Sequence, residues 1–386
     1  MRPLFCLLMI FTLLAPSAAQ WFWAGVVSDQ ARADVMPPPE NHFWLTSTFA
    51  GADHTPSITA VAFDQTIPGL ALAAEDTVRG RLWRSTDHGV HWSLLPGFQS
   101  SDLRYSYKVA YGALPETFYA YSPARVFKTS DAGETWTELP YETSNCAYLM
   151  TLVAHPITPT ILFAGANYAF ARSLDGGQTW DATPPMPGYP GACSNDIYAS
   201  SIAVGVNRPN VIYVGQNWNS GGVLKSTDLG ESWQAVNTGL PTSNDFNDIL
   251  VKQVVVDPRD ADIAYALMNR SHQVYRTTNG GEQWQPLTQG AEGVSFDALA
   301  FDVAAADAGQ GAGLYALDHT DVYFLPDGAD AWQEVRSERP GINGGSIAGD
   351  IVVDPFVPGR IILRNSDGIA VQLPLRGRAF LPALKR

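Results

Sequence analysis

The chain has 386 residues, a formal net charge of −14, 16% charged residues, 34 glycines and 27 prolines. The negative charge argues against a nucleic-acid or anionic-membrane partner, because phosphate binding needs concentrated lysine and arginine. Many glycines and prolines among few charges are typical of short strands joined by tight turns and argue against a helical bundle or a coiled coil.

The N-terminal segment has the features of an export signal. Arg2 supplies a positive start, Leu4 to Ala15 form an apolar stretch, and Ser17-Ala18-Ala19 form a small-residue cleavage site. The apolar stretch is too short to anchor the chain in a bilayer. We therefore expect a signal peptide at 1–19, and a secreted or periplasmic protein without a membrane anchor. Residues 20–40, which contain three consecutive prolines, are expected to form an extended lead-in.

Five later segments share one arrangement: an apolar strand, a polar break that often contains proline, and a second apolar strand. They are 58–74, 152–165, 202–215, 254–267 and 351–364. Uninterrupted apolar runs such as Val254-Val255-Val256 predict strands buried on both faces. First strands are expected near residues 59, 107, 150, 201, 252, 297 and 350.

One eight-residue sequence motif, here called the phrase, follows the apolar strands in five units. A sixth, degenerate copy keeps its Asp, Gly and Trp. The copies are STDHGVHW (85–92), TSDAGETW (129–136), SLDGGQTW (173–180), STDLGESW (226–233), TTNGGEQW (277–284) and LPDGADAW (325–332). Asp or Asn bonds nearby backbone N–H groups, and Gly accepts a positive φ, so the phrase predicts a hairpin corner. A recurrence roughly every 48 residues indicates propeller blades or solenoid units.

The phrase resembles the Asp-box, or bacterial neuraminidase, repeat S/T-x-D/N-x-G-x-x-W. The chain after residue 40 resembles the single-propeller members of that group: photosystem II assembly factors, sortilin-type receptors and sialidases. The resemblance implies that the boxes are structural corners away from the ligand site. With four antiparallel strands expected per unit, we predict an all-β fold in which residues 41–386 form a single seven-bladed β-propeller.

The seventh unit lacks a box, so the ring has two candidate closures. Trp44 lies where a fourth-strand Trp is expected, so HFWLTSTF (42–49) is predicted to be the outer strand of blade seven. Phe380 is the alternative, because its spacing after Trp332 equals the repeat. We favour closure through the N-terminal strand.

The ligand is expected on the face opposite the boxes, which carries the loops between blades and between second and third strands. These loops are rich in Tyr, Trp, Asn and Asp, which suit sugar rings and protein surfaces equally. Blade-top packing and loop capping are the alternative roles for such residues. The candidate ligand-binding residues are Tyr107, Tyr148, Asn167, Tyr168, Tyr189, Tyr198, Asn217, Trp218, Asn219 and Asp245.

Two cysteines remain after the predicted cleavage, Cys146 and Cys193, at equivalent points of consecutive inter-blade loops. An even pair in an exported chain favours a disulfide. Metal ligation is not expected, because no His or Cys cluster accompanies the pair. His88 and His91 flank a box Gly and are expected on the surface. We expect no cofactor and a monomer.

Glycoside hydrolysis needs two carboxyl groups across the scissile bond. The candidate acids are Asp102, Glu142, Asp196, Asp245 and Asp248, each of which is expected to cap a loop rather than to act as a catalyst. The chain has no Arg-Ile-Pro triplet, which the sialidases carry, and length for only one of the two facing propellers of the Asp-box xyloglucanases. We therefore expect a non-catalytic recognition or assembly module for a glycan or protein ligand. The alternative is an exported glycoside hydrolase of sialidase-like or xyloglucanase-like type.

Overall fold

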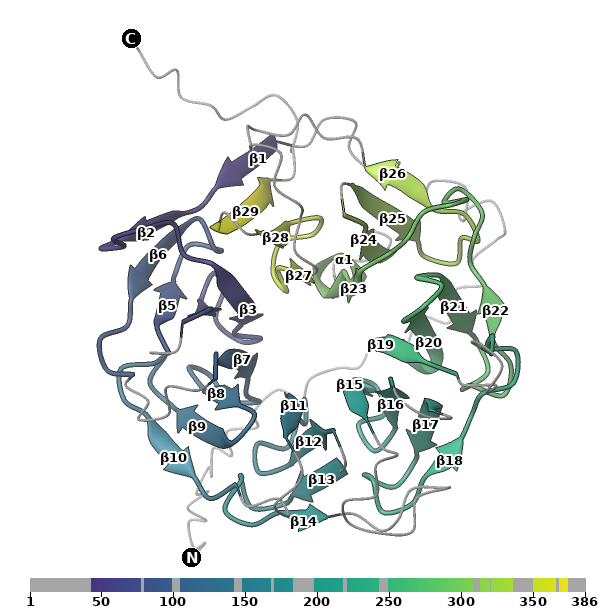
Figure 1. Ribbon diagram of the computed structural model, residues 1–386, viewed down its shortest axis with the longest axis horizontal. Helices are drawn as coiled ribbons and strands as arrows, with labels where there is room; N and C mark the ends of the chain where they lie inside the picture. The colour runs from purple at the N-terminus through teal and green to yellow at the C-terminus, as the bar shows by residue number, and fades with distance from the viewer. Residues whose placement is uncertain are drawn as a thin grey trace, which may run out of the picture. The chain divides into compact units, whose positions relative to one another are not determined.

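The repeated apolar segments form seven sheets arranged around a common centre, as the computed structural model shows (Figure 1). The structure describes residues 43–77, 80–98, 105–141, 148–167, 170–182, 198–217, 221–242, 249–307, 313–319, 321–335, 350–365 and 368–373. All of these belong to one compact unit, Met36–Arg386. The predicted seven-bladed propeller is therefore confirmed, whereas the predicted signal peptide and lead-in lie outside the described residues.

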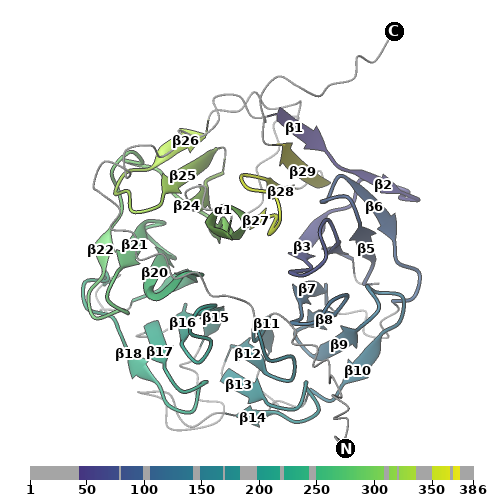
Figure 2. The ribbon, with the colours of Figure 1, turned by 180° about the vertical axis from the view of Figure 1, so that it is seen from behind.

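Each sheet is a blade whose strands follow one another outward from the centre, and the view from behind shows the same order (Figure 2). The first strands are β3 (Ile58–Phe63), β7 (Lys108–Tyr111), β11 (Leu149–Ala154), β15 (Ala199–Val204), β19 (Val251–Asp257), β23 (Ala298–Phe301) and β27 (Asp350–Val353). The second strands are β4 (Ala71–Glu75), β8 (Phe118–Ser122), β12 (Leu162–Ala166), β16 (Ile212–Gln216), β20 (Asp260–Met268), β24 (Gly313–Leu317) and β28 (Ile361–Asn365).

The outer half of each blade contains the third and fourth strands. The third strands are β5 (Leu82–Ser85), β9 (Arg125–Thr129), β13 (Phe170–Ser173), β17 (Gly222–Ser226), β21 (Val274–Thr277), β25 (Val322–Pro326) and β29 (Gly368–Leu373). The fourth strands are β6 (His91–Leu94), β10 (Thr137–Leu139), β14 (Asp181–Ala182), β18 (Gln234–Ala235), β22 (Gln285–Pro286), β26 (Gln333–Val335) and, in blade seven, β1 (Phe43–Thr46). One short helix, α1 (Val303–Asp307), follows β23.

The second box shows why the repeated phrase makes a hairpin corner. Thr129 Oγ1 donates to Asp131 Oδ1 at 2.6 Å and accepts the Gly133 N–H at 3.0 Å, while Asp131 Oδ1 accepts the Thr135 N–H at 2.9 Å. The other four full copies repeat these three bonds. Gly133 has φ +94°, and its four equivalents also have positive φ, so the turn chemistry expected of the boxes is present.

The boxes and the breaks between first and second strands lie on one face, here called the Asp-box face. The residue before each box Gly donates its N–H to the neighbouring break, as His88 does to Gly69 O and Ala132 does to Glu116 O. The opposite face, here called the inter-blade face, carries the loops between blades and the loops between second and third strands. There Asn167 N–H donates to Tyr148 O, and Asn217 N–H donates to Tyr198 O.

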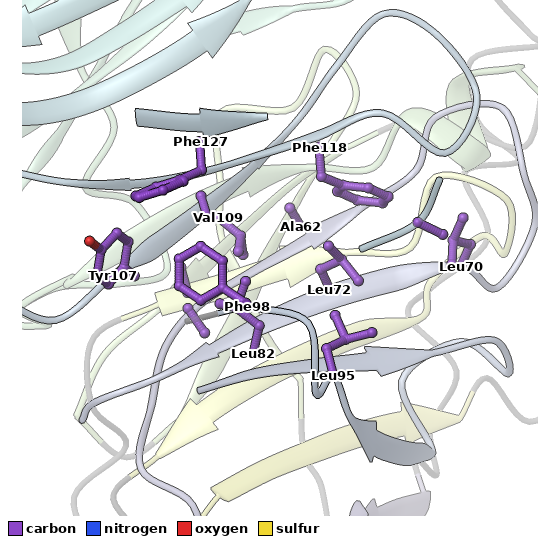
Figure 3. Close-up of a cluster of buried hydrophobic side chains, with 14 residues drawn as sticks. Ala62, Leu70, Leu72, Leu82, Leu95, Phe98, Tyr107, Val109, Phe118 and Phe127 are labelled. Atoms are coloured by element: carbon purple, nitrogen blue, oxygen red, sulfur yellow. The ribbon is translucent and has the colours of Figure 1, made fainter. Parts of the chain in front are cut away.

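The hydrophobic core is divided among the contacts between neighbouring blades. Seven buried clusters each combine side chains of two adjacent blades. In the cluster between blades one and two, Phe98 packs edge-on against Tyr107 and Phe127, with Leu72 and Leu82 beneath (Figure 3). Each blade is therefore stabilised by the next, and an open ring would leave two apolar sheet faces in water.

The ring is closed by the N-terminal strand, as the position of Trp44 predicts. β1 pairs antiparallel with β29, with Trp44 opposite Gln372, and Trp44 is only 4% exposed. The chain then continues into β2 (Thr48–Ala50), which pairs parallel with β6 of blade one. The segment 43–50 thus joins blade seven to blade one. Phe380, the alternative, lies outside the described residues.

Two details differ from expectation. The first strands are not buried on both faces: Val255 and Val256 are partly exposed because they line a central cavity. His88 is not a simple surface residue, because its Nδ1 lies 2.6 Å from Oδ2 of the fully buried Asp354 in blade seven. The left-handed backbone at His88, φ 63°, belongs to the box turn. His91 is exposed, as expected, beside Asp87.

Candidate functional site: the channel mouth on the inter-blade face

The first strands of all seven blades surround a central cavity of about 690 Å³. The cavity follows the axis of the ring, where the seven innermost strands converge (Figure 1). Towards the Asp-box face its lining is apolar and includes Pro156, Val206, Pro258 and Pro355. Towards the inter-blade face its lining becomes polar and charged.

The heads of the first strands form the channel mouth on the inter-blade face. The lining residues there are Thr59, Lys108, Met150, Ser200, Lys252, Asp297 and Asp350. Arg364 of β28 also lines the mouth and is the fifth charged residue of the cavity. Three cations and two carboxylates therefore meet at the mouth, although the chain as a whole carries a net charge of −14.

One charged cluster lies between blades seven, one and two. Arg364 Nε lies 4.0 Å from Asp350 Oδ2, and its Nη1 donates to Ile58 O of β3 at 2.8 Å. Lys108 Nζ donates to Met150 O of β11 at 3.2 Å. Burial by the channel walls lowers the pKa of Lys108, and the charge of Asp350 opposes this shift. Burial raises the pKa of Asp350, and Arg364 and Lys108 oppose that shift.

The second cluster surrounds Asp297, whose side chain is only 7% exposed. Lys252 Nζ donates to Asp297 Oδ1 at 2.9 Å, and His319 Nδ1 lies 2.7 Å from Oδ2. His272 Nδ1 lies 3.7 Å from the same carboxylate and 3.0 Å from Phe296 O. Asp297 Oδ1 is thus hydrogen-bonded, whereas Oδ2 is buried and has no hydrogen-bond partner among the described residues despite its short distance to His319. Among the described residues, no group of three His, Cys, Asp or Glu side chains could hold a metal ion.

The uncharged polar side chains of the wall bond to neighbouring strands. Ser200 Oγ donates to Val251 O at 3.0 Å, and Thr59 Oγ1 donates to Tyr107 O at 2.5 Å. Gln253 bonds both the N–H and the carbonyl of Leu299, at 2.8 and 2.9 Å. These side chains hold adjacent first strands together. The charged residues are therefore the wall groups best able to contact a ligand.

Five of the ten predicted ligand residues lie within the described structure. Tyr107 is fully buried in the interface between blades one and two, so it contributes to packing (Figure 3). Tyr148 is 51% exposed, its N–H donates to Asn167 Oδ1 at 2.5 Å, and its ring lies 6.2 Å from that of Tyr105. Tyr198 and Asn217 hold the equivalent places in the next blade and are partly exposed.

The other predicted ligand residues lie outside the described residues: Tyr168, Tyr189, Trp218, Asn219 and Asp245. The same is true of the predicted disulfide partners, Cys146 and Cys193, and of the candidate catalytic acids Asp102, Glu142, Asp196 and Asp248.

Loop composition did not identify the charged residues of the channel mouth, because they belong to strands. A sequence signal for them does exist. A lysine or aspartate is the first or second residue of four mainly apolar first-strand segments: KVAY, VKQVVVD, DALAF and DIVV. A charge in that position is unexpected for a strand packed on both faces, and it indicates a wall that water or a ligand reaches.

Comparison with known proteins finds solved structures that have a similar fold. No family model matches the chain, and no curated protein matches its sequence. The chain is similar to the solved structure of YCF48 bound to D1 peptide, with a TM-score of 0.63, 14% identity, and coverage of 88% of this chain and 97% of that one. YCF48 from Cyanidioschyzon merolae gives a TM-score of 0.60, with 13% identity over 86% and 98%.

An ancestral GH74 enzyme gives a TM-score of 0.49, with 22% identity over 66% of this chain and 34% of that enzyme. At these identities the likeness to YCF48 shows a shared propeller fold. Within the described residues, no helix is long and apolar enough to span a membrane.

Proposed function

We propose that the protein is an exported, non-catalytic recognition or assembly module that binds a protein ligand at the channel mouth on the inter-blade face. The observation that carries the proposal is the cavity of about 690 Å³, whose mouth on the inter-blade face brings five charged side chains together. Pockets of this size with a few convergent polar groups are typical binding sites. The solved YCF48 structure with a bound D1 peptide supports a peptide-like ligand for such a propeller.

The Asp-box face is the less suitable surface because the turn-forming polar groups of its boxes already bond one another. In all five full boxes the Asp or Asn, the hydroxyl and the Gly N–H bond one another, and the Trp side chains pack between blades. On the inter-blade face, Tyr148 is half exposed, and Asn217 Oδ1 is buried without a hydrogen-bond partner among the described residues. Aromatic and amide groups of this kind suit a peptide backbone and its side chains.

The test is selection from a random peptide display library against the exported form, residues 20–386. Selected peptides are then measured with Trp218→Ala, which the sequence predicts to lie in a loop of the inter-blade face, and with Trp136→Ala, in a box. Truncating a binding anchor commonly costs about 2 kcal/mol, roughly thirtyfold in affinity. We expect that loss with Trp218→Ala and lowered stability with normal binding for Trp136→Ala. Selection of no peptide would overturn the protein-ligand proposal, and normal binding by Trp218→Ala would remove Trp218 from the site.

An assay on xyloglucan and on sialylated oligosaccharides tests the alternative of a glycoside hydrolase. Turnover that is abolished by alanine at Asp102, Glu142, Asp196, Asp245 or Asp248 would show an enzyme. Without turnover, the recognition proposal stands.

A further inference from the structure

The cationic donors at the channel mouth are distributed unequally between its two clusters. Around Asp297, one carboxylate is contacted by Lys252, His272 and His319. In the other cluster, Lys108 and Arg364 share a single carboxylate, Asp350. The Asp297 cluster contains a lysine–carboxylate hydrogen bond, whereas in the second cluster, here called the Lys108–Arg364 corner, Arg364 Nε lies 4.0 Å from Asp350 and Lys108 bonds Met150 O instead.

Arg364 reaches the corner from blade seven and leaves part of its guanidinium unused. Among its five N–H donors, one at Nη1 bonds Ile58 O. Nε is buried and has no hydrogen-bond partner among the described residues, and Asp350 Oδ2 lies 4.0 Å from it. A buried, charged donor without a partner is energetically unfavourable. The guanidinium group is therefore well placed to donate hydrogen bonds to an anionic group of a ligand.

Lys108 reaches the corner from blade two and is similarly under-used. Its three donors make one bond, to Met150 O at 3.2 Å, and it forms no ion pair within the described part of the chain. The channel wall surrounds its ammonium group enough to lower its pKa. Lys108 is nevertheless exposed as a residue, so a ligand that enters the channel mouth can reach its ammonium group.

We propose that the Lys108–Arg364 corner is an anion-binding site that receives a carboxylate of the protein ligand. This inference rests on the proposed function and specifies its ligand chemistry. A guanidinium edge matches the two oxygens of a carboxylate, and a nearby ammonium adds a point charge. The carboxylate comes from an Asp or Glu side chain or from a chain terminus, and the tests below separate these sources.

The first test measures the anion site alone with a defined probe, N-acetylglutamate, by saturation-transfer NMR and calorimetry. N-acetylglutaminamide, in which both carboxyl groups are replaced by amides, is the matched probe without charge. The variants are Lys108→Met and Arg364→Met, and the matched control is Lys128→Met, a lysine of β9 in the same blade as Lys108 that lies over the Tyr119 ring outside the channel. Thermal melts check that each variant is folded.

We expect saturable binding of N-acetylglutamate to the wild type and to Lys128→Met. Binding should be about tenfold or more weaker in Lys108→Met and Arg364→Met, because each removes a charge-assisted bond. N-acetylglutaminamide should bind weakly to all four proteins. Equal binding of the two probes, or unchanged affinity in both channel variants, would overturn the anion site.

The second test uses the peptides selected under the proposed function. Each peptide is synthesised with a free or amidated C-terminus, and with Asp and Glu replaced by Asn and Gln. Loss of binding on one of these changes, together with dependence on Lys108, identifies the source of the carboxylate.

The results distinguish the two proposals. If peptides bind but ignore every loss of carboxylate, the anion inference fails and the protein-ligand function stands. If N-acetylglutamate binds at Lys108 but no peptide is selected, the protein-ligand function fails and the anion site stands. Lys108-dependent binding of a glucuronate-bearing oligosaccharide, with no peptide selected, would show that the ligand is an acidic glycan.

Discussion

The box hairpins and the channel mouth occupy equivalent places in successive blades, yet they use their residues in opposite ways. In the boxes the same three hydrogen bonds recur five times, from Ser85 to Asn279. At the channel mouth the residue type changes from blade to blade, as in Thr59, Lys108 and Asp297. The backbone conformation of a hairpin corner restricts which residue types can form it, whereas the first residues of an inner strand can be of many types. Variation within one chain thus marks the positions that folding leaves free for binding.

The largest predicted effect is a loss of folding, and it should come from removing the N-terminal strands that close the ring. Deleting residues 20–50 removes β1 and β2, and with them the buried Trp44 and the join between blades seven and one. We expect no cooperative folded state, because two blade faces would be exposed to water. Far-UV circular dichroism during heating and size-exclusion chromatography would measure this. Deleting residues 20–40 alone is the control and should leave the ring folded.

A folded 51–386 fragment with the wild-type melting temperature would contradict closure by the N-terminal strand.

A valine in a box should have the next largest effect. Gly133 has φ +94°, and a Cβ there would lie 2.6 Å from Leu95 Cδ1 of the neighbouring blade. Gly133→Val should therefore lower the free energy of unfolding by about 1–3 kcal/mol or more through backbone strain and a core clash. Gly176→Val is the matched control, because its φ is +76° and a Cβ there meets nothing within 4 Å.

Urea denaturation of both variants separates the strain from the clash. Equal losses would show that the contact with Leu95 contributes nothing.

The fold could be predicted from sequence because its determinants are local and repeated. Asp131 and Gly133 show their role within an eight-residue phrase, and the position of Trp44 in the repeat identified the closing strand. The parallel pairing of β2 and the contact between His88 and Asp354 could not be predicted, because they join residues from opposite ends of the chain. Such contacts depend on how the ring closes.

The candidate site was predicted less well, for a related reason. Tyr107 was predicted to bind a ligand because aromatic residues are common at binding surfaces, but its side chain is buried between two blades. The sequence alone does not show towards which side an aromatic residue before a first strand points. Arg364 lies opposite Asp350 in the pairing of β27 with β28, but only the ring geometry brings the two near Lys108 of blade two. A site whose residues come from several blades produces no recognisable motif in the sequence of any single blade.

A smaller, pH-dependent effect should distinguish the boxes from one another. Hydroxyl donation from Thr129 and Thr135 holds the pKa of Asp131 at about 2, below its ordinary value of 3.8. Because the folded-state pKa is depressed, this stabilisation is fully present above about pH 4 and is lost as the pH falls towards 2. Asn279 makes the equivalent bonds in the fifth box without titrating.

Asp131→Asn should therefore be tolerated at pH 7 with a modest loss of stability. It should also reduce the fall in melting temperature between pH 4 and pH 2. An unchanged acid dependence would show that Asp131 does not contribute to the titration of stability.

The smallest effect on stability should come from Lys108→Met at the channel mouth. The ammonium group makes one hydrogen bond, to Met150 O, and that carbonyl lies at a wall where water can replace it. Its burial is partial and lowers its pKa, so removing the charge also removes a desolvation cost. We expect the free energy of unfolding, measured in urea at pH 7, to change by no more than about 1 kcal/mol. Gly133→Val in the same experiment provides the scale. A loss as large as that of the box variant would show that Lys108 holds the ring together, and the channel mouth would then be as structurally constrained as the hairpins.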